Sequence, residues 1–421
     1  MRLFPLVPSL AIALSVLSHE AHGGSLRSEV REGLRARVES KRDHAWTVGR
    51  EDLHTRRATQ AFYARRGFAS AWLDENCPTS AAKALRTRLD EAPSHGLGTD
   101  AYHIREIDRH LARGTGCRRG SWESADAVEL ELLLTDAFFL LSAHLIGGRV
   151  DATTLDPEWQ ATKQEVDLVA LLDAVTAGQQ TIGPALDSLL PVAPQYQGLR
   201  TALRTYRLIE GSGGWRPLSS SKAADAEELR ERLRREGYDP TALRASLVEF
   251  QERHGLPGTG ELDGDTLAEL NVPVADRIQQ IELALERWRW LPRELGERHV
   301  FVNIPDYSLR AVDKGKTVLD MRAIVGKPYR RTPMLSSKIR YIVVSPTWTV
   351  PPTVLRKDLL PKMKKDRGFL AKSGMTLYEG WGTSAKRIDP KSINWSKMSP
   401  SRFRYRVVQS PGPKNALGRV K

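Results

Sequence analysis

The chain has 421 residues, of which 40% are hydrophobic, and it carries a formal net charge of +13. This length suffices for two or three domains, and the hydrophobic content is ordinary for a soluble protein. The charge is unevenly placed, because 26 Lys and Arg stand against 7 Asp and Glu from Phe301 onward, a net of +19. A basic half suggests nucleic acid, anionic lipid or an acidic polymer as partner. The export predicted below argues against nucleic acid.

The N-terminus has the pattern of a signal peptide, predicted over residues 1–23. A short basic region precedes an apolar run from Leu3 to Leu17, and Ala21-His22-Gly23 forms a small-x-small cleavage site. The run is short and interrupted by prolines, which disfavours the alternative of an uncleaved anchor. No later stretch is expected to approach the length of a membrane span. We therefore expect an exported protein of the periplasm or cell envelope.

The chain contains two cysteines, Cys77 and Cys117, and both lie in its N-terminal part. Thiols pair in an oxidising compartment, so a disulfide between them is predicted. The alternative, that one of them is a nucleophile, is disfavoured because neither is flanked by His and Gly as in a reactive cysteine motif.

Residues 24–60 are charged and lack a strong apolar pattern, so this segment is expected to be poorly defined. Residues 61–216 are predicted to be helical, and Ala125 to Leu145 is apolar nearly all round, as is typical of a central helix. The histidines of this region show no metal-binding spacing, and no metal site is predicted. The other expected helices span Ala81–Ala92, Val166–Ala177 and Leu199–Glu210.

Residues 223–272 are predicted to form three short helices after a polar linker. Leu229 and Leu233 mark the first, and Asp239-Pro240 is expected to cap and open the second. Ser219-Ser220-Ser221-Lys222 in the linker matches Ser-x-x-Lys, but the Ser-Asp-Asn and Lys-Thr-Gly partners of that nucleophile motif are absent from the sequence. Residues 273–297 are expected to be a connecting amphipathic helix.

The periodicity changes to two from residue 298 onward, which indicates β-strands. The expected strands begin with His299–Pro305, Ser308–Val312 and Thr317–Gly326, and continue with Ile339–Pro346, Arg402–Arg406 and Leu417–Lys421. Between them, residues 354–398 form a basic, partly helical insertion. The last strand is expected to begin just where the sequence stops, which predicts an incomplete sheet that is marginally stable and prone to aggregate.

Several motifs resemble those of the L,D-transpeptidases with a YkuD-type catalytic domain, in their long YcbB-like branch. They are Gln409-x-Pro-Gly-x-x-Asn415-Ala-Leu-Gly, Pro346-x-Trp348-x-Val350-Pro351 and Glu286-Arg-Trp-Arg-Trp-Leu-Pro292. The run from Phe250 to Asn271 resembles a three-helix peptidoglycan-binding domain. The resemblance implies a multidomain α+β fold with a helical scaffold region, that three-helix domain and an incomplete, mostly-β catalytic domain carrying a capping insertion.

The resemblance also implies an activity, cysteine-dependent acyl transfer between peptidoglycan stem peptides to form 3–3 crosslinks. The family's His and Ser-His-Gly-Cys motif are absent from this sequence. We therefore assign no catalytic residue and expect the 421-residue chain to be an inactive fragment. The alternative is a non-catalytic wall-binding or scaffold protein. Peptidoglycan is the expected partner, no cofactor is expected, and the candidate substrate-binding residues are Trp348, Tyr378, Trp381, Gln409 and Asn415.

Overall fold

The computed structural model describes residues 26–74, 77–113, 123–157, 159, 165–219 and 226–421. The predicted signal peptide and Cys117 lie outside these residues. The chain divides into two compact units, residues 1–336 and residues 337–421.

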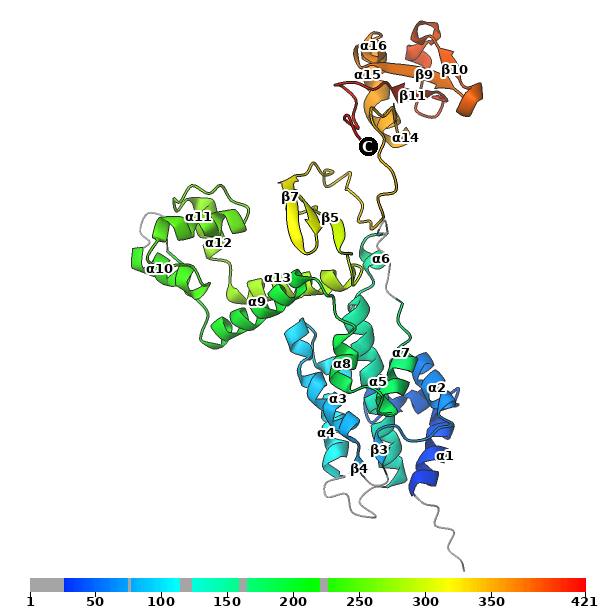
Figure 1. Cartoon of the computed structure of the whole chain (residues 1–421), viewed down its shortest axis with the longest axis vertical. Helices are drawn as coiled ribbons and strands as arrows, with labels where there is room; N and C mark the ends of the chain where they lie inside the picture. Colours follow the sequence, from blue (N-terminus) through cyan, green and yellow to red (C-terminus); the bar gives the residue numbers. More distant parts are fainter. Residues whose placement is uncertain (1–25, 75–76, 114–122, 158, 160–164, 220–225) are drawn as a thin grey trace, which may run out of the picture. The chain divides into compact units, whose positions relative to one another are not determined.

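The first unit is built on a helical body whose longest helix, α5 (Ser124–Gly147), runs among the others (Figure 1). Leucine and phenylalanine side chains bury most of α5, as its apolar sequence predicts. The expectation that no later stretch approaches the length of a membrane span is wrong. By length and composition α5 could cross a membrane, but 72% of its apolar window is buried inside the structure, as in the core helix of a soluble protein.

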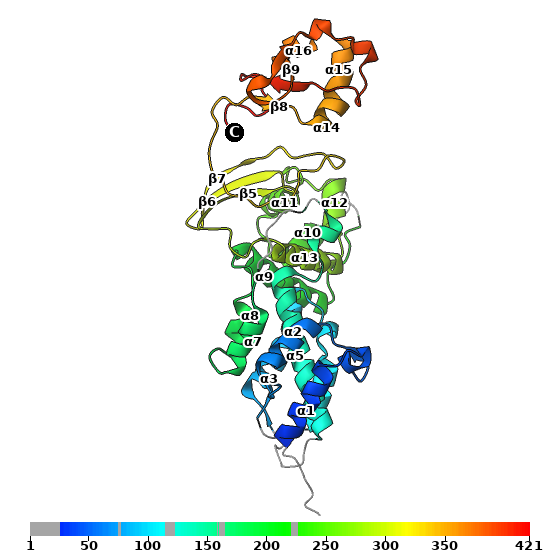
Figure 2. The ribbon, with the colours of Figure 1, turned by 90° about the vertical axis from the view of Figure 1, so that its right-hand side faces the viewer.

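The other helices of this body are shorter than α5, and several of them pack directly on it. Figure 2 shows several of them along its length. Two hairpins of two-residue strands lie between the first three helices, β1–β2 before α2 and β3–β4 after it. The elements are α1 (Leu26–Val38), β1 (Thr47–Val48), β2 (Glu51–Asp52), α2 (Arg56–Arg65), β3 (Leu73–Asp74), β4 (Cys77–Pro78), α3 (Ser80–Asp90), α4 (Ile104–Arg113), α6 (Ala152–Leu155), α7 (Leu168–Thr176), α8 (Ile182–Asp187) and α9 (Pro194–Gly211).

Helix α1 corrects the expectation of a poorly defined segment at residues 24–60. Val30, Leu34 and Val38 recur every four residues and are buried against the core, although charged residues separate them. An apolar stripe of this width is enough to dock a helix whose other faces are solvated.

The predicted three-helix region forms a separate small core from α10 (Ala226–Arg235), α11 (Leu243–Arg253) and α12 (Gly264–Leu270). Phe250 and Leu233 are fully buried in it. Asp239 does not cap α11, because its Oδ1 accepts from Thr241 in a turn and the helix begins four residues later. Asp263 caps α12 through the backbone N–H of Thr266 (2.8 Å).

The connecting helix α13 (Val274–Arg289) packs along α9 (Figures 1 and 2). Arg289 is buried at its end and donates to the carbonyl oxygen of His95 (2.8 Å) and to the hydroxyl of Tyr196 (3.3 Å). An antiparallel sheet follows, made of β5 (Arg298–Asn303), β6 (Ser308–Asp313) and β7 (Lys316–Arg322) in that order.

The second unit surrounds a four-stranded antiparallel sheet with the order β10-β9-β11-β8. Val407 and Leu377 face a core that short helices complete. Its elements are β8 (Trp348–Thr349), α14 (Pro352–Val354), a π-helical turn (Leu355–Leu359), α15 (Leu360–Lys365), α16 (Phe369–Lys372), β9 (Met375–Glu379), β10 (Lys386–Ile388) and β11 (Arg406–Gln409).

Three predicted strands of this unit are wrong or displaced. Residues 339–346 and 417–421 form no strand and are joined by the isolated bridge between Val344 and Val420. The strand expected at Arg402–Arg406 lies further along, as β11. Alternating apolar residues predict a strand only where a partner strand satisfies the backbone.

Candidate functional site

The candidate substrate-binding residues lie on or next to the sheet of the second unit. Trp348 on β8 is directly opposite Gln409 on β11. Side chains alternate between the faces of a strand, so these two share the face of the buried Val407. Trp348 is half-buried and packs against the core, which is the position of an anchoring residue.

Gln409 and Asn415 use their side-chain amides to shape the loop between them. The Nε2 of Gln409 donates to the carbonyl oxygens of Ser373 (3.0 Å) and Lys414 (2.8 Å). The Nδ2 of Asn415 donates to the carbonyl oxygen of Pro346 (3.0 Å), and its Oδ1 accepts from the N–H of Leu417 (2.8 Å). Both side chains are buried, so the geometry gives them a role in positioning the loop. A direct contact with substrate stays a prediction for both.

Tyr378 and Trp381 lie together on the other face of the sheet, around Arg406, which none of the sequence motifs indicates. The guanidinium carbon of Arg406 is 5.2 Å from the ring centroid of Tyr378 and 4.9 Å from that of Trp381. Arg406 is opposite Tyr378 in the register of β11 and β9. Residues directly opposite share a face, so the strand pairing brings them together. The sequence shows Arg406 beside Tyr405, but the register that places it on Tyr378 is not visible there.

The second unit is strongly basic, with 19 Lys and Arg against 4 Asp and Glu in residues 337–421. Within it, Lys372 pairs with Asp366 (2.8 Å), and this pairing together with the N–H of Gly368 lowers the pKa of the Asp366 carboxyl. With so few carboxylates in the unit, most of its cations have no acidic neighbour, and a surface of this kind attracts anionic ligands.

Known protein families match three stretches of the chain in order. Residues 57–203 match a scaffold domain, residues 222–270 a peptidoglycan-binding domain and residues 297–421 the L,D-transpeptidase catalytic domain, YkuD. The chain carries an L,D-transpeptidase catalytic domain. The expected family and the multidomain α+β fold class are confirmed.

A protein of Haemophilus influenzae named "Putative L,D-transpeptidase" is similar to this chain, with 36% identity over 143 residues. The match covers 34% of this chain and 28% of that protein. The chain therefore matches less than a third of the length of this relative.

The stretch that matches the L,D-transpeptidase catalytic domain contains a single histidine, His299, and no cysteine. The Nδ1 of His299 lies 2.8 Å from the carbonyl oxygen of Gly296, in the turn before β5. Cys77, at the start of β4 in the scaffold domain, is disulfide-bonded. Cys117 lies outside the described residues, so the pairing of these two cysteines stays a prediction.

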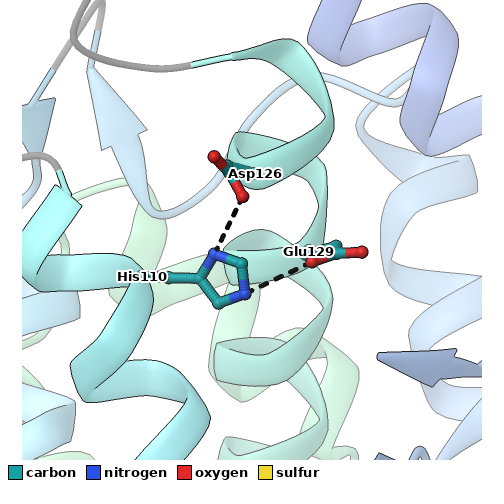
Figure 3. Close-up of side chains that lie close together, drawn as sticks. All are labelled: His110, Asp126 and Glu129. Carbon is teal, nitrogen blue, oxygen red and sulfur yellow. Dashed lines mark ion pairs between the residues drawn. The ribbon is translucent and has the colours of Figure 1, made fainter. Parts of the chain in front are cut away.

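One group of described residues has the composition of a metal site. His110 on α4 lies between Asp126 and Glu129 on α5 (Figure 3), and one ligand atom of each falls within 4.8 Å of the others. The Nδ1 of His110 faces Asp126 (3.6 Å), whereas its Nε2 faces Glu129 (3.3 Å). The two lone-pair directions of an imidazole diverge, so this arrangement suits a histidine held between two carboxylates better than one bound metal ion. Asp126 also pairs with Arg113, and we propose no metal here.

Two cavities lie in the first unit, whereas the candidate residues belong to the second unit. A cavity of about 210 Å³ near the end of α5 is lined by Gly148, Trp159 and Trp290 among others. The two tryptophan rings meet edge to face, with centroids 5.5 Å apart. These contacts have the character of packing between α13 and the scaffold domain.

Proposed function

We propose that this chain acts in the crosslinking of peptidoglycan, as an exported L,D-transpeptidase family protein of the cell envelope. The observation that carries the proposal is the presence, in one chain, of the catalytic-domain match at residues 297–421 and the peptidoglycan-binding match at residues 222–270. A wall-binding domain beside a catalytic domain holds the enzyme on its polymeric substrate and raises the local concentration of stem peptides. The basic charge of the second unit suits the carboxylates of those peptides.

The proposed reaction is an acyl transfer that produces a 3–3 crosslink. A cysteine thiolate attacks the carbonyl carbon of the third residue of a tetrapeptide stem. The bond to the terminal D-alanine breaks as its nitrogen takes up a proton, which releases D-alanine and leaves a thioester. The side-chain amine of a second stem then attacks the thioester and gives up a proton, which forms the new amide and returns the thiolate. Donors that stabilise the oxyanion of each tetrahedral intermediate complete such a site.

The catalytic-domain stretch of this sequence contains no cysteine to perform the first step. We propose that the 421-residue chain is inactive by itself and that a longer reading frame supplies the histidine and the cysteine. The absence of a nucleophile from residues 297–421 also favours a second candidate, a wall-binding scaffold protein without catalysis. The codons that follow Lys421 separate the two candidates, since only the first requires an open frame beyond that residue.

A crosslinking assay tests the activity. The 421-residue chain and the protein made from any longer frame are incubated with disaccharide-tetrapeptide, and the products are analysed by mass spectrometry for 3–3 linked dimers. We expect dimers from the longer protein and none from the shorter chain. Dimers made by the 421-residue chain would contradict its proposed inactivity and would require another nucleophile.

Retention on purified sacculi tests wall binding. We expect the full chain to sediment with sacculi and the variant F250D to lose most of this retention, because Phe250 is fully buried in the three-helix core. E252A changes an exposed residue of the same helix and serves as the matched control. Equal retention of F250D and the unaltered chain would show that this domain does not bind the wall.

A further inference from the structure

The outer face of the second unit's sheet carries a row of two arginines and one tyrosine. Tyr378 on the inner strand β9 is directly opposite Arg387 on β10 and directly opposite Arg406 on β11. All three side chains therefore emerge on the same face, the one turned away from the buried Leu377 and Val407. Trp381 follows β9, and its ring lies 4.9 Å from the guanidinium carbon of Arg406.

The guanidinium of Arg406 is fixed in place but has no anionic partner. The rings of Tyr378 and Trp381 hold it by cation–π contacts, and its Nε is buried without a hydrogen-bond partner. Among the residues that the structure describes, no carboxylate lies within 4 Å of Arg406 or Arg387. Structural arginines are commonly paired, as Arg289 is with Glu286 at 2.7 Å in the first unit.

The ring of Trp381 beside Arg406 is accessible to a ligand. Trp381 is 72% exposed, although tryptophan is the largest apolar residue, and its ring contacts the guanidinium of Arg406. An aromatic ring beside an unpaired guanidinium offers an apolar contact and a charge at one position, which is what an anionic group on a short peptide requires.

We propose that Arg406, positioned by Tyr378 and Trp381, binds a carboxylate of the peptidoglycan stem peptide, and that Arg387 adds a second positive charge across Tyr378. The inference rests on the proposed function, since that function supplies the peptide. The two rings contact the guanidinium by cation–π interaction, and its terminal N–H groups donate to the two carboxylate oxygens. Arg406 is thus a substrate-positioning residue of this domain that gives preference to stems with free carboxylates.

Binding of disaccharide-tetrapeptide to the full chain tests this, measured by isothermal titration calorimetry. The second ligand is the same molecule with its carboxylates converted to amides. We expect R406Q to weaken binding of the free acid about tenfold or more, which corresponds to ~1.4 kcal/mol. W381A is expected to weaken it several-fold. Amidation should weaken binding to the unaltered chain about as much as R406Q does, and should change little for R406Q itself.

R367Q is the matched control, because Arg367 is an exposed arginine in the turn between α15 and α16. We expect its affinity to stay within twofold of the unaltered chain. Circular dichroism checks that R406Q remains folded, and W381A alters a side chain exposed enough to leave the core intact. If R406Q fails to fold, W381A provides the test. Weaker binding of the free acid than by the unaltered chain supports the inference, and unchanged affinity contradicts it.

Unchanged affinity in both R406Q and W381A would overturn the inference. Equal weakening by amidation in the unaltered chain and in R406Q would do the same, because Arg406 would then not be the group that contacts the carboxylate. Absence of binding by the unaltered chain would also overturn it. None of these outcomes alters the result of the sacculus-retention or crosslinking assays, which judge the proposed function separately.

Discussion

The carboxylate of Glu286 on α13 lies against the α-carbon of Gly148, just after the end of α5, in the space that a side chain at residue 148 would need. Its Oε1 accepts from the backbone N–H groups of Arg149 (2.6 Å) and Val150 (3.0 Å). Burial raises the pKa of Glu286, but the hydrogen bond from Arg289 and those backbone N–H groups outweigh burial and lower it. One carboxylate thus fastens the connecting helix to the scaffold domain.

Replacing Gly148 by alanine is expected to loosen this attachment. Gly148 has φ +77° and ψ 177°, a region that is essentially restricted to glycine, and a Cβ there would lie 2.7 Å from the Nε1 of Trp290 besides colliding with Glu286. We expect G148A to cost about 2–4 kcal/mol of local stability. Hydrogen exchange of peptides from α13 measures it. G147A is the control, since a Cβ at Gly147 meets nothing within 4 Å, and equal exchange in the two variants would contradict the prediction.

Glu131 is expected to be essential for the helical scaffold. It is fully buried on α5, and its carboxylate accepts from the N–H groups of Ala71 (2.9 Å), Trp72 (2.8 Å) and Leu73 (3.0 Å) and from the hydroxyl of Tyr63 (2.8 Å). In E131Q an amide N–H₂ would face these donors, so we expect a loss of about 2–4 kcal/mol.

The measurement for E131Q is hydrogen exchange of peptides from α5. E32Q removes the same charge from an exposed position on α1 and should change the protection of α5 little. Protection of α5 in E131Q that matches the unaltered chain would show that the carboxylate is replaceable.

The pair His103 and Asp136 is expected to make the stability of the scaffold domain depend on pH. Their Nε2 and Oδ2 atoms are 2.8 Å apart in the core. Burial lowers the pKa of His103, but the hydrogen bond and charge of Asp136, followed by those of Glu51, outweigh it and raise that pKa. Burial raises the pKa of Asp136, but the hydrogen bonds from His103 and Thr55 outweigh burial and lower it.

A raised histidine pKa gives stability that is complete below the unfolded value of about 6.5 and is lost as the pH rises through the folded value. A lowered aspartate pKa gives stability that is complete above about 3.9 and is lost as the pH falls through the folded value. The pair should therefore contribute most between about pH 4 and pH 6.5.

We expect H103N to destabilise the scaffold by about 3 kcal/mol at pH 5 and by less at pH 8.5, because removing one member leaves the other buried and unpaired. Asparagine tolerates the positive φ of residue 103 (+57°), so the backbone is not the cause. Calorimetric melting at the two pH values measures the difference, with H44N at an exposed site as control. A destabilisation that is equal at both pH values would exclude the proposed linkage.

The disulfide between Cys77 and Cys117 is expected in protein purified from the periplasm without reductant. A loop of about forty residues closed in this way stabilises the folded state by about 4 kcal/mol in the chain-entropy model. Mass spectrometry of a proteolytic digest should show the two cysteine peptides linked, and the double variant C77S/C117S should melt earlier. Two free thiols in the native protein would refute the pairing.

The sequence predicts the helices of this protein well where an apolar stripe repeats. A period of 3.6 residues places the apolar side chains of these helices against a core. Examples are Phe138 and Leu141 on α5, Leu247 and Phe250 on α11, and Trp288 on α13. Helix α1 was not predicted, because charged residues separate Val30, Leu34 and Val38 and obscure their apolar pattern. The strand expected at residues 339–346 is not present. In the described residues this segment pairs with other backbone only around the bridge at Val344, and its apolar side chains are exposed.

The candidate site was predictable in its parts and not in its arrangement. Tyr378 and Trp381 were identifiable as aromatic residues in a basic insertion, but Arg406 lies 28 positions after Tyr378 and reaches it only through the register of β9 and β11. The motif residues Gln409 and Asn415 were recognisable, yet their amides turn inward to backbone carbonyl groups. Long-range pairing depends on the whole fold, so no local pattern contains it.

Strand β9 belongs to the stretch at residues 354–398 that the sequence marks as an insertion, yet it lies between β10 and β11 in the sheet. A segment that supplies an interior strand of a sheet cannot be exchanged or deleted without breaking the hydrogen bonds to its neighbouring strands. Its removal would leave β11 and β8 as a two-stranded ribbon, which is at best marginally stable in water. The pairing with β11 therefore restricts which substitutions the paired residues of β9 tolerate. Chimaeras with relatives should carry β9, β10 and β11 together.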